Sequence, residues 1–375
     1  MIYADYNATT PLRDEAREAM LAAMAAPGNP SSVHRAGRAA RAVLESARRS
    51  LAALLGATPE AVIFTSGGTE ADLMALGGSG RKRVLVSAIE HDAVLAVPGV
   101  ERVPVLSNGL IDLAALEARL VAETEPALVS VMWANNETGA IQPLADIVAL
   151  ARAHGALVHS DAVQAVGKLP VDFTASGLDL MSVSAHKIGG PPGVGALLVR
   201  EGLTLDPLIT GGGQERGRRS GTENLVGIAG FGAAADTVSR ERASTLGEGM
   251  IDRVAALRDR LESRILDAAP AARVLCREVP RLGNTSCIVM PGMPAETQVM
   301  ALDIEGIAVS AGSACSSGKV KRSHVVEAME PDGAAAETTI RVSLGWLSTE
   351  AEVDRLADAW IKLYKRADAQ NRALD

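Results

Sequence analysis

The lysine in SVSAHKIGG (182–190) is the residue of this sequence that most clearly indicates a chemical function. Ser184 and His186 precede Lys187, and the whole group follows directly on an apolar run. A lysine amine can hold an aldehyde cofactor as an imine. A lysine on its own is most often a solvated surface charge. Here the Ser-x-His-Lys pattern and the glycines that follow it favour a binding site.

A carboxylate with a matching role ends a second apolar run, in LVHSDAVQAVG (157–167). A carboxylate can keep the pyridine nitrogen of an aldehyde cofactor protonated, so that the ring accepts electrons. Asp161 is the candidate, because a buried strand would deliver it at the carboxyl end of a sheet. Lys187 and Asp161 are therefore predicted to face the same cofactor.

An anion-binding turn is predicted at residues 66–69 (SGGT), after the apolar run AVIFT (61–65) and before a helical pattern. Backbone N–H groups and the helix dipole would converge there on a phosphate. The alternative for a Ser/Gly turn is an ordinary helix N-cap. The glycine run at 189–198 is not a dinucleotide fingerprint, because it precedes a strand and contains two prolines that break a helix.

Cys315 lies in SAGSACSSGKVKRSH (310–324), where small residues surround it and Lys319, Lys321 and Arg322 follow. Small residues allow a loop to bend, and nearby cations lower a thiol pKa below its usual value of about 8.5. A reactive thiol on a mobile loop is therefore predicted, with an inert loop thiol as the alternative.

The other two cysteines lie in apolar surroundings. Cys276 is in VLCREV and Cys287 is inside a strand pattern. We interpret both as core or partly buried thiols.

The elements that position these residues alternate between short apolar runs and amphipathic stretches. Strands are predicted at 61–65, 83–87, 127–134, 156–160, 179–183 and 194–199. Amphipathic helices are predicted between some of them, at 112–123 and 143–154. Such alternation is typical of a largely parallel sheet covered by helices on both faces.

The alternation of short strands and helices ends after about residue 223. One long helical pattern runs to about 268, and a strand at 285–290 and helices at 295–304 and 349–368 follow. We predict a large cofactor-binding domain at 13–256, and a smaller α+β domain formed by 1–12 and 257–375.

Composition narrows the class of protein. The 375 residues are 47% hydrophobic but only 2% aromatic, so the core is built from Ala, Leu and Val. The net charge of −8 disfavours direct nucleic-acid binding. No apolar run is long enough to span a bilayer, and the first residues lack a signal-peptide pattern. Three cysteines make neither a disulfide framework nor a zinc cluster. We therefore expect a cytoplasmic protein with no bound metal.

Eight separated motifs resemble those of one known family, in the family's order. They are YADYNATTPL (3–12), GNPSSVHRAGR (28–38), FTSGGTEA (64–71), EHDAV (90–94), ANNETGAIQP (134–143), GGGQERGRRSGTEN (211–224), SAGSACSSG (310–318) and TIRVSLGW (339–346). The chain resembles the cysteine desulfurases, which belong with the class V aminotransferases among the fold-type I pyridoxal-phosphate (PLP) enzymes. The resemblance implies a PLP-dependent transferase with a mainly parallel central sheet, helices on both of its faces and a smaller α+β domain.

The resemblance also implies roles for named residues around pyridoxal 5'-phosphate. The phosphate would be bound by Gly68, Thr69, Ser184 and His186, with Thr222 supplied to the phosphate of a partner subunit, which implies a homodimer. His91 would stack on the ring and transfer protons. The ordinary pKa of a histidine, about 6.5, suits proton transfer because it lies close to physiological pH. Asn136 and Gln164 would donate to the phenolic oxygen.

Asn136 is also expected to contact the substrate, together with two further residues. Asn7 belongs to the N-terminal NATT motif, and Arg341 belongs to TIRVSLGW. A guanidinium can grip a carboxylate at two points, which makes Arg341 the candidate clamp for the substrate carboxylate. The alternative is a surface arginine on an edge strand.

The activity that the resemblance implies converts L-cysteine to L-alanine and leaves a persulfide on Cys315. The loop resembles that of the long-loop branch, the NifS/IscS type. A sulfur-acceptor protein would then take the sulfur, either an iron–sulfur scaffold or a tRNA-thiolation relay. A selenocysteine lyase or an aminotransferase on the same fold is the alternative, and a catalytically silent scaffold protein is a third possibility.

Overall fold

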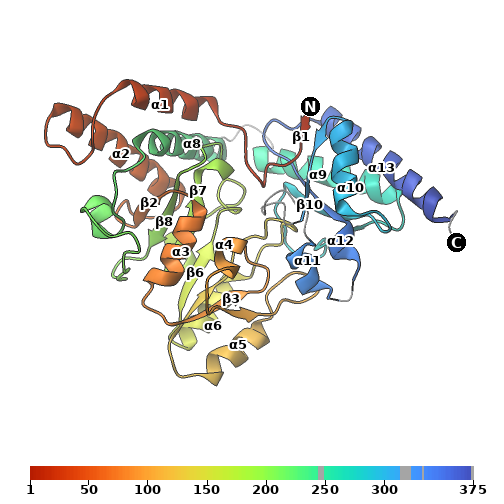
Figure 1. Cartoon of the computed structure of the whole chain (residues 1–375), viewed down its shortest axis with the longest axis horizontal. Coiled ribbons are helices and arrows are strands. Elements are labelled where there is room, and N and C mark those ends of the chain that lie inside the picture. Colours follow the sequence, from red (N-terminus) through yellow and green to blue (C-terminus); the bar gives the residue numbers. More distant parts are fainter. Residues whose placement is uncertain (244–248, 313–321, 332, 373–375) are drawn as a thin grey trace.

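The computed structural model describes residues 1–243, 249–312, 322–331 and 333–372. Its larger sheet has the strand order β2-β8-β7-β6-β5-β3-β4. Figure 1 labels β2, β8, β7, β6 and β3 of this sheet. The pairings of β3 with β4 and β5, and of β6 with β5 and β7, are parallel, whereas β8 is antiparallel to both β2 and β7. The predicted, mainly parallel sheet is confirmed. Its strands are β2 (Val62–Thr65), β3 (Arg83–Ser87), β4 (Glu101–Val103), β5 (Ala127–Ser130), β6 (Leu157–Asp161), β7 (Leu180–Ser184) and β8 (Gly195–Val199).

Helices cover both faces of this sheet, as predicted. Alternate strand residues enter different cores: Leu85 packs with residues of α2, α5, α6 and α8, whereas Val84 and Val86 pack with residues of α3 and α4. This division follows from the two-residue side-chain period of a strand. The helices of this part are α1 (Asp14–Ala25), α2 (Arg35–Leu54), α3 (Gly68–Gly78), α4 (Asp92–Leu95), α5 (Leu113–Ala122), α6 (Leu144–Ala153), α7 (Phe173–Ser176) and α8 (Leu225–Ala243).

The strand predicted at 127–134 is shorter in the structure, because β5 ends at Ser130. Beyond it, the amide of Met132 donates 2.8 Å to the carboxylate of Glu90. The residues after β5 thus leave the regular strand and line the site described below.

A second, smaller part contains the antiparallel sheet β12-β13-β10-β9 and the short parallel pair of β1 and β11. Ile288 and Ile340 pack against α9, α10 and α13, and Cys287 and Val289 pack on the other face with α11 and α12. The elements are β1 (Ile2–Tyr3), β9 (Arg273–Val274), β10 (Thr285–Val289), β11 (Ile307–Ala308), β12 (Ser310–Ala311), β13 (Thr339–Ser343), α9 (Met250–Ala268), α10 (Ala295–Ile304), α11 (His324–Met329), α12 (Ala335–Thr338) and α13 (Glu350–Arg372).

The single long helix predicted from 223 to about 268 is wrong. The structure has two helices there, α8 and α9, and Gly249 before α9 has φ −56° and ψ 156°, which is not a helical conformation. Helical periodicity alone does not show where a chain leaves the helix. The domain boundary predicted at residue 256 falls inside α9, whose Val254 and Leu257 both belong to the core of the smaller part. That boundary stays a prediction.

The N-terminal segment joins the two parts. Ile2 and Tyr3 pair with β11 in the smaller part, where the N-terminus lies in Figure 1. Further along, Thr10 and Arg13 bind the larger part: the Thr10 hydroxyl donates 2.8 Å to the carbonyl of His186, and the Arg13 amide donates 2.9 Å to that of Gly189. The first residues of the chain therefore reach the turn that carries Lys187.

A buried ion pair supports the end of β2, just before the predicted phosphate turn. Both amino groups of the Arg48 guanidinium lie 2.8 Å from the carboxylate of Glu215, which also accepts from the amide of Phe64 at 2.9 Å. Both side chains are almost fully buried. Glu215 thus links α2, β2 and the glycine-rich segment at 211–217.

We expect Glu215→Ala to lower the free energy of unfolding by about 3–5 kcal/mol, because it leaves the Arg48 charge buried without its partner. The midpoint of urea denaturation measures the change. Glu305→Ala is the control, since the pair of Glu305 with Lys362 is solvent-exposed and should matter little. Equal midpoints for the two variants would contradict a stabilising role of Glu215.

Among the residues that the structure describes, no helix is both long and apolar enough to cross a membrane.

Candidate active site

A cavity of about 260 Å³ opens where β6, β7 and the N-terminus of α3 meet. This volume is close to the lower end of small-molecule pockets, roughly 300–1,000 Å³. It brings together eleven of the thirteen predicted site residues, which are Asn7, Gly68, Thr69, His91, Asn136, Asp161, Gln164, Ser184, His186, Lys187 and Arg341. Thr222 lines a different pocket, and Cys315 lies outside the described residues.

Lys187 ends a short 3-10 turn, Ala185–Lys187, directly after β7. Its Nζ donates to the carbonyl of Asn7 at 2.5 Å and to that of Ala8 at 2.8 Å. The Thr10 hydroxyl accepts from the amide of Gly189 at 2.8 Å, on the far side of the same turn. The N-terminal segment therefore holds the lysine at the cavity from two sides.

Asp161 is the last residue of β6 and is buried. Burial raises its pKa, while the amide of Val163, 2.8 Å from Oδ1, and the nearby His91 and Lys187 oppose that rise. A further positive charge beside Asp161 would favour the ionised form. The position is thus suited to bind a protonated nitrogen.

The predicted phosphate turn sits at the N-terminus of α3, with Gly67 as its N-cap. Gly68 closely approaches the neighbouring loop, since a Cβ added to it would lie 2.9 Å from a methyl group of Val163. The amide of Ser66 already donates 2.7 Å to the carboxylate of Glu70. The groups left to bind an anion are therefore the N-terminus of α3 and the exposed hydroxyl of Thr69.

His91 precedes α4, and its Nδ1 accepts from the amide of Ala93 at 3.1 Å. This bond orients the ring at the cavity wall. His186, on the Lys187 turn, has its Nδ1 3.2 Å from the hydroxyl of Thr9. Burial, and next the charge of Lys187, lower its pKa to about 4. His186 is therefore neutral at physiological pH.

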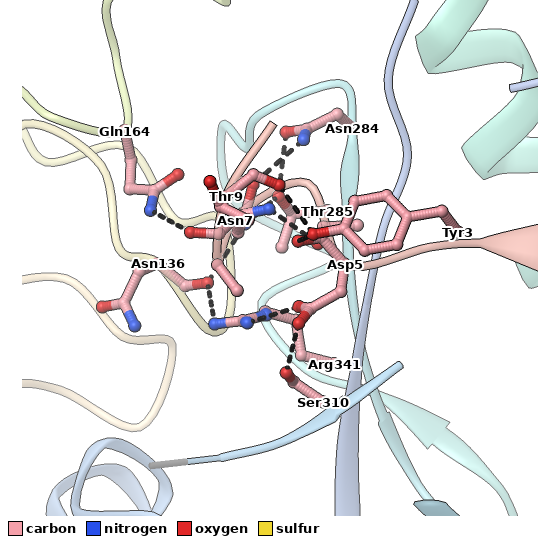
Figure 2. Close-up of polar contacts among 12 residues, drawn as sticks. Tyr3, Asp5, Asn7, Thr9, Asn136, Gln164, Asn284, Thr285, Ser310 and Arg341 are labelled. Carbon is pink, nitrogen blue, oxygen red and sulfur yellow. Dashed lines mark hydrogen bonds and ion pairs between the residues drawn. The ribbon is translucent and has the colours of Figure 1, made fainter. Parts of the chain in front are cut away.

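Asn7 is a hydrogen-bonding centre between the two parts of the molecule, as Figure 2 shows. Its Nδ2 donates to the carbonyl of Asn136 at 3.1 Å and to the hydroxyl of Thr285 at 2.9 Å. Its Oδ1 accepts from Asn284 at 3.0 Å and its carbonyl from Gln164 at 3.0 Å. The side chain is thus engaged with protein partners, and its substrate contact stays a prediction.

Arg341 lies on β13, between β10 and β12, and is only 4% exposed. The alternative of a surface arginine on an edge strand is wrong. Its Nη2 donates 2.7 Å to Asp5, and its Nη1 donates 3.2 Å to the carbonyl of Asn136 (Figure 2). Asp5 also accepts from Ser310 at 2.8 Å. Nε is buried and has no partner within the described part of the chain.

Sequence reasoning missed three ionisable residues at this site. Asp72 lines the cavity four residues after Gly68, a spacing that puts both on one face of α3. Burial raises the pKa of Asp72 and of Glu90 well above the ordinary range, and the charge of Asp161 raises both further. The third residue is Lys168, four residues after Gln164 in a segment that forms turns and not a helix, so its spacing gives no comparable signal.

Thr222 is exposed and lines a pocket of about 90 Å³ together with Thr65, Ser66 and Arg219. Ser66 belongs to the phosphate turn, so Thr222 lies on the outer side of that turn. Its contact with the phosphate of a partner subunit stays a prediction.

Cys276 and Cys287 are buried, as predicted. Burial raises the pKa of Cys276 to about 11 and that of Cys287 well above its ordinary value. Neither thiol is therefore a ready nucleophile.

One of the three cations expected to activate Cys315 is already paired. Arg322 contacts the carboxylates of Glu327 at 2.9 Å and Glu337 at 3.4 Å. These carboxylates offset its charge. Cys315, Lys319 and Lys321 lie outside the described residues.

A lysine after one sheet strand, an aspartate at the end of the next, and a helix N-terminus at the same cavity define the arrangement of a fold-type I PLP enzyme. The family model described as aminotransferase class-V matches residues 2–356. A cysteine desulfurase of Cereibacter sphaeroides is 46% identical over 95% of this chain and 94% of its own. An IscS-like cysteine desulfurase of Mycobacterium tuberculosis is 43% identical over 94% of each chain. The X-ray structure of a NifS-like protein from Rickettsia africae has a TM-score of 0.88 at 34% identity, over 97% of this chain and 99% of that one.

The chain therefore belongs to the class V aminotransferase family and, within it, to the cysteine desulfurases. The family resemblance stated from the sequence motifs is confirmed.

Proposed function

We propose that this protein converts L-cysteine to L-alanine and takes up the sulfur as a persulfide on Cys315. The observation that carries the proposal is the convergence of Lys187, Asp161 and the N-terminus of α3 on one cavity. A lysine, a buried carboxylate and an anion-binding turn are the three groups that an aldehyde cofactor with a pyridine ring and a phosphate requires.

The residues present fit pyridoxal 5'-phosphate. The N-terminus of α3 with Thr69 suits its phosphate, Asp161 suits its ring nitrogen, and Lys187 suits its aldehyde carbon. Gln164 and Asn136 can donate to its phenolic oxygen from the cavity wall. When bound, the cofactor supplies an electron-accepting ring joined to the amine of the substrate.

The chain's own residues carry out the proton transfers and hold the substrate. Lys187 Nζ, held against the N-terminal carbonyls, would take the proton from the α-carbon of cysteine. His91, fixed by the Ala93 amide, would exchange a proton at the other side of the ring. Arg341, which lines the cavity, would hold the substrate carboxylate through its guanidinium.

Cys315 would complete the reaction as a nucleophile. Its thiolate attacks the sulfur of cysteine, so a sulfur–sulfur bond forms while the bond between the β-carbon and sulfur breaks. The electron pair of the broken bond passes to carbon, which takes a proton and becomes the methyl group of alanine. One thiol is thus oxidised to a persulfide as the carbon is reduced, and no further oxidant is required.

The persulfide would pass to a thiol of a sulfur-acceptor protein of iron–sulfur cluster assembly or tRNA thiolation. We further propose a homodimer in which Thr222 reaches the phosphate of the partner subunit. The free thiols of Cys276 and Cys287 and the persulfide itself suit a reducing cytoplasm.

Product analysis tests the proposal. The purified, PLP-loaded protein is incubated with L-cysteine, with L-selenocysteine, and with an amino acid and a 2-oxo acid. Alanine and enzyme-bound sulfur from cysteine support a desulfurase. Alanine from selenocysteine alone would identify a lyase, transamination alone would identify an aminotransferase, and no product with any of them would indicate a scaffold.

We expect Arg341→Ala to raise the KM for cysteine roughly 10- to 100-fold, the effect of losing a charged hydrogen bond of about 1.5–3 kcal/mol. Steady-state kinetics measure the change. The Asp5 pair could mean that Arg341 is merely structural, so Asp5→Asn is the matched control. If Arg341 binds substrate, Asp5→Asn keeps a KM near that of the parent. Equal KM increases in both variants would contradict a substrate role.

A further inference from the structure

Lys168 lies behind the cavity and contacts two residues of its wall. Its Nζ donates to Gln164 Oε1 at 2.6 Å and to Asn7 Oδ1 at 2.6 Å. Lys168 itself lines a small neighbouring cavity rather than the one that faces Asp161. It thus touches the two wall residues from the side opposite to the substrate.

The bond from Lys168 and the bond to the Asn7 carbonyl together determine which end of the Gln164 amide faces which neighbour. A lysine ammonium can only donate, so it selects the amide oxygen. The Gln164 Nε2 then faces the carbonyl of Asn7, to which it donates at 3.0 Å. One N–H of the amide is used there, and the second has no partner among the described residues. Gln164 therefore presents a donor, and not an acceptor, at the cavity.

Both contacts of Lys168 persist whether or not its amine is charged. Burial lowers its pKa well below the ordinary value, and the positive charges of Lys187 and Arg341 lower it further. A neutral amine still carries two N–H groups, enough for Gln164 and Asn7, and the Asn7 carbonyl, which can only accept, still selects Gln164 Nε2. The arrangement therefore depends on geometry rather than on charge.

The same pair of bonds joins the two parts of the molecule. Asn7 belongs to the N-terminal segment that crosses from the smaller part, whereas Gln164 follows β6 in the larger sheet. Lys168 connects their side chains at one atom. A shift of the N-terminal segment would consequently change the position of the Gln164 amide.

We propose that Lys168 is a positioning residue, which holds the Gln164 amide with its N–H toward the phenolic oxygen of the cofactor and aligns it with Asn7. The inference rests on the proposed function, since it needs a phenolic oxygen in the cavity. Without Lys168, the amide oxygen of Gln164 loses its donor among the described contacts, and the single bond from Nε2 to the Asn7 carbonyl is left to hold the amide.

The test is the pH midpoint of the visible absorbance of the PLP-loaded protein, measured without substrate. A donor to the phenolic oxygen stabilises its negative charge and weakens its attraction for the proton shared with the Lys187 nitrogen. Loss of that donor therefore raises the midpoint. We expect Lys168→Met to raise it by about half a pH unit or more, the effect of one ordinary hydrogen bond.

A double-mutant cycle shows whether Lys168 acts through Gln164. Gln164→Leu should raise the midpoint by itself, and adding Lys168→Met to it should then change little. Lys362→Met, an exposed lysine paired with Glu305, is the control and should keep the parental midpoint. Urea denaturation of all variants separates this effect from a loss of stability.

An unchanged midpoint in Lys168→Met would overturn the inference. An equal shift on both backgrounds would also overturn it, because Lys168 would then act independently of Gln164. If the parent produces alanine from cysteine while the midpoint is unchanged, this inference fails and the proposed function stands. If the parent shows no visible band and no alanine, both fail.

Discussion

Lys187→Ala is expected to lower the rate of alanine formation at least about a thousandfold, because it removes both the amine that holds the cofactor and the carrier of the α-proton. The variant should also bind PLP more weakly, with loss of the visible band. The fold should survive, since the Thr10 hydroxyl also holds the turn that carries Lys187, through the carbonyl of His186 and the amide of Gly189. Alanine is quantified after incubation of equal amounts of folded protein with cysteine.

Lys82→Ala is the matched control, because Lys82 is an exposed lysine of the larger part outside the cavity. It should keep the parental rate and absorbance. Conversion of cysteine by Lys187→Ala at a near-parental rate would show that another residue carries the proton, and the assignment of Lys187 would be abandoned.

Cys315→Ala is expected to keep the cofactor absorbance and its change on addition of cysteine, yet to form almost no alanine. The groups predicted to hold the cofactor are Lys187, Asp161 and the turn at 66–69, so binding needs no thiol, whereas attack on the substrate sulfur does. Alanine release and mass spectrometry after a single turnover measure the two steps. In the parent, the peptide containing Cys315 should gain one sulfur atom.

The two buried cysteines provide the controls. Cys276→Ala and Cys287→Ser should keep the chemistry, because burial raises both thiol pKa values and neither thiol lines the cavity. Any loss of activity should follow a loss of stability. A persulfide on Cys276 or Cys287, or full activity in Cys315→Ala, would refute the mechanism.

Much of the site could be predicted from the sequence because its residues stand at the ends of strands. Asp161 and Lys187 follow apolar runs, and parallel strands bring their carboxyl ends to one edge of a sheet. The turn at 66–69 follows the same rule, since it lies between β2 and α3. Local pattern and topology thus indicated Asp161, Lys187 and the turn at 66–69, whereas the family resemblance implied the other predicted residues that lie at the same cavity.

Lys168 and Asp5 were missed because their roles depend on contacts between distant segments. Lys168 meets Asn7 across 161 positions of sequence, and Asp5 meets Arg341 across 336. Neither spacing produces a local signal. The break between α8 and α9 was missed for another reason, since the periodic apolar pattern gives no measure of backbone angles at Gly249.

The class of the sheet, the family and the chemical groups of the site could be predicted from the sequence, because strand periodicity and short motifs are local properties. The pairing of those groups is visible only in the folded chain. There Asp5 lies against Arg341, Lys168 contacts both Gln164 and Asn7, and Asp72 lines the cavity. The contacts of Asp5 and Asn7 follow from the crossing of the N-terminal segment between two cores, which depends on packing over the whole chain and not on any single stretch of residues.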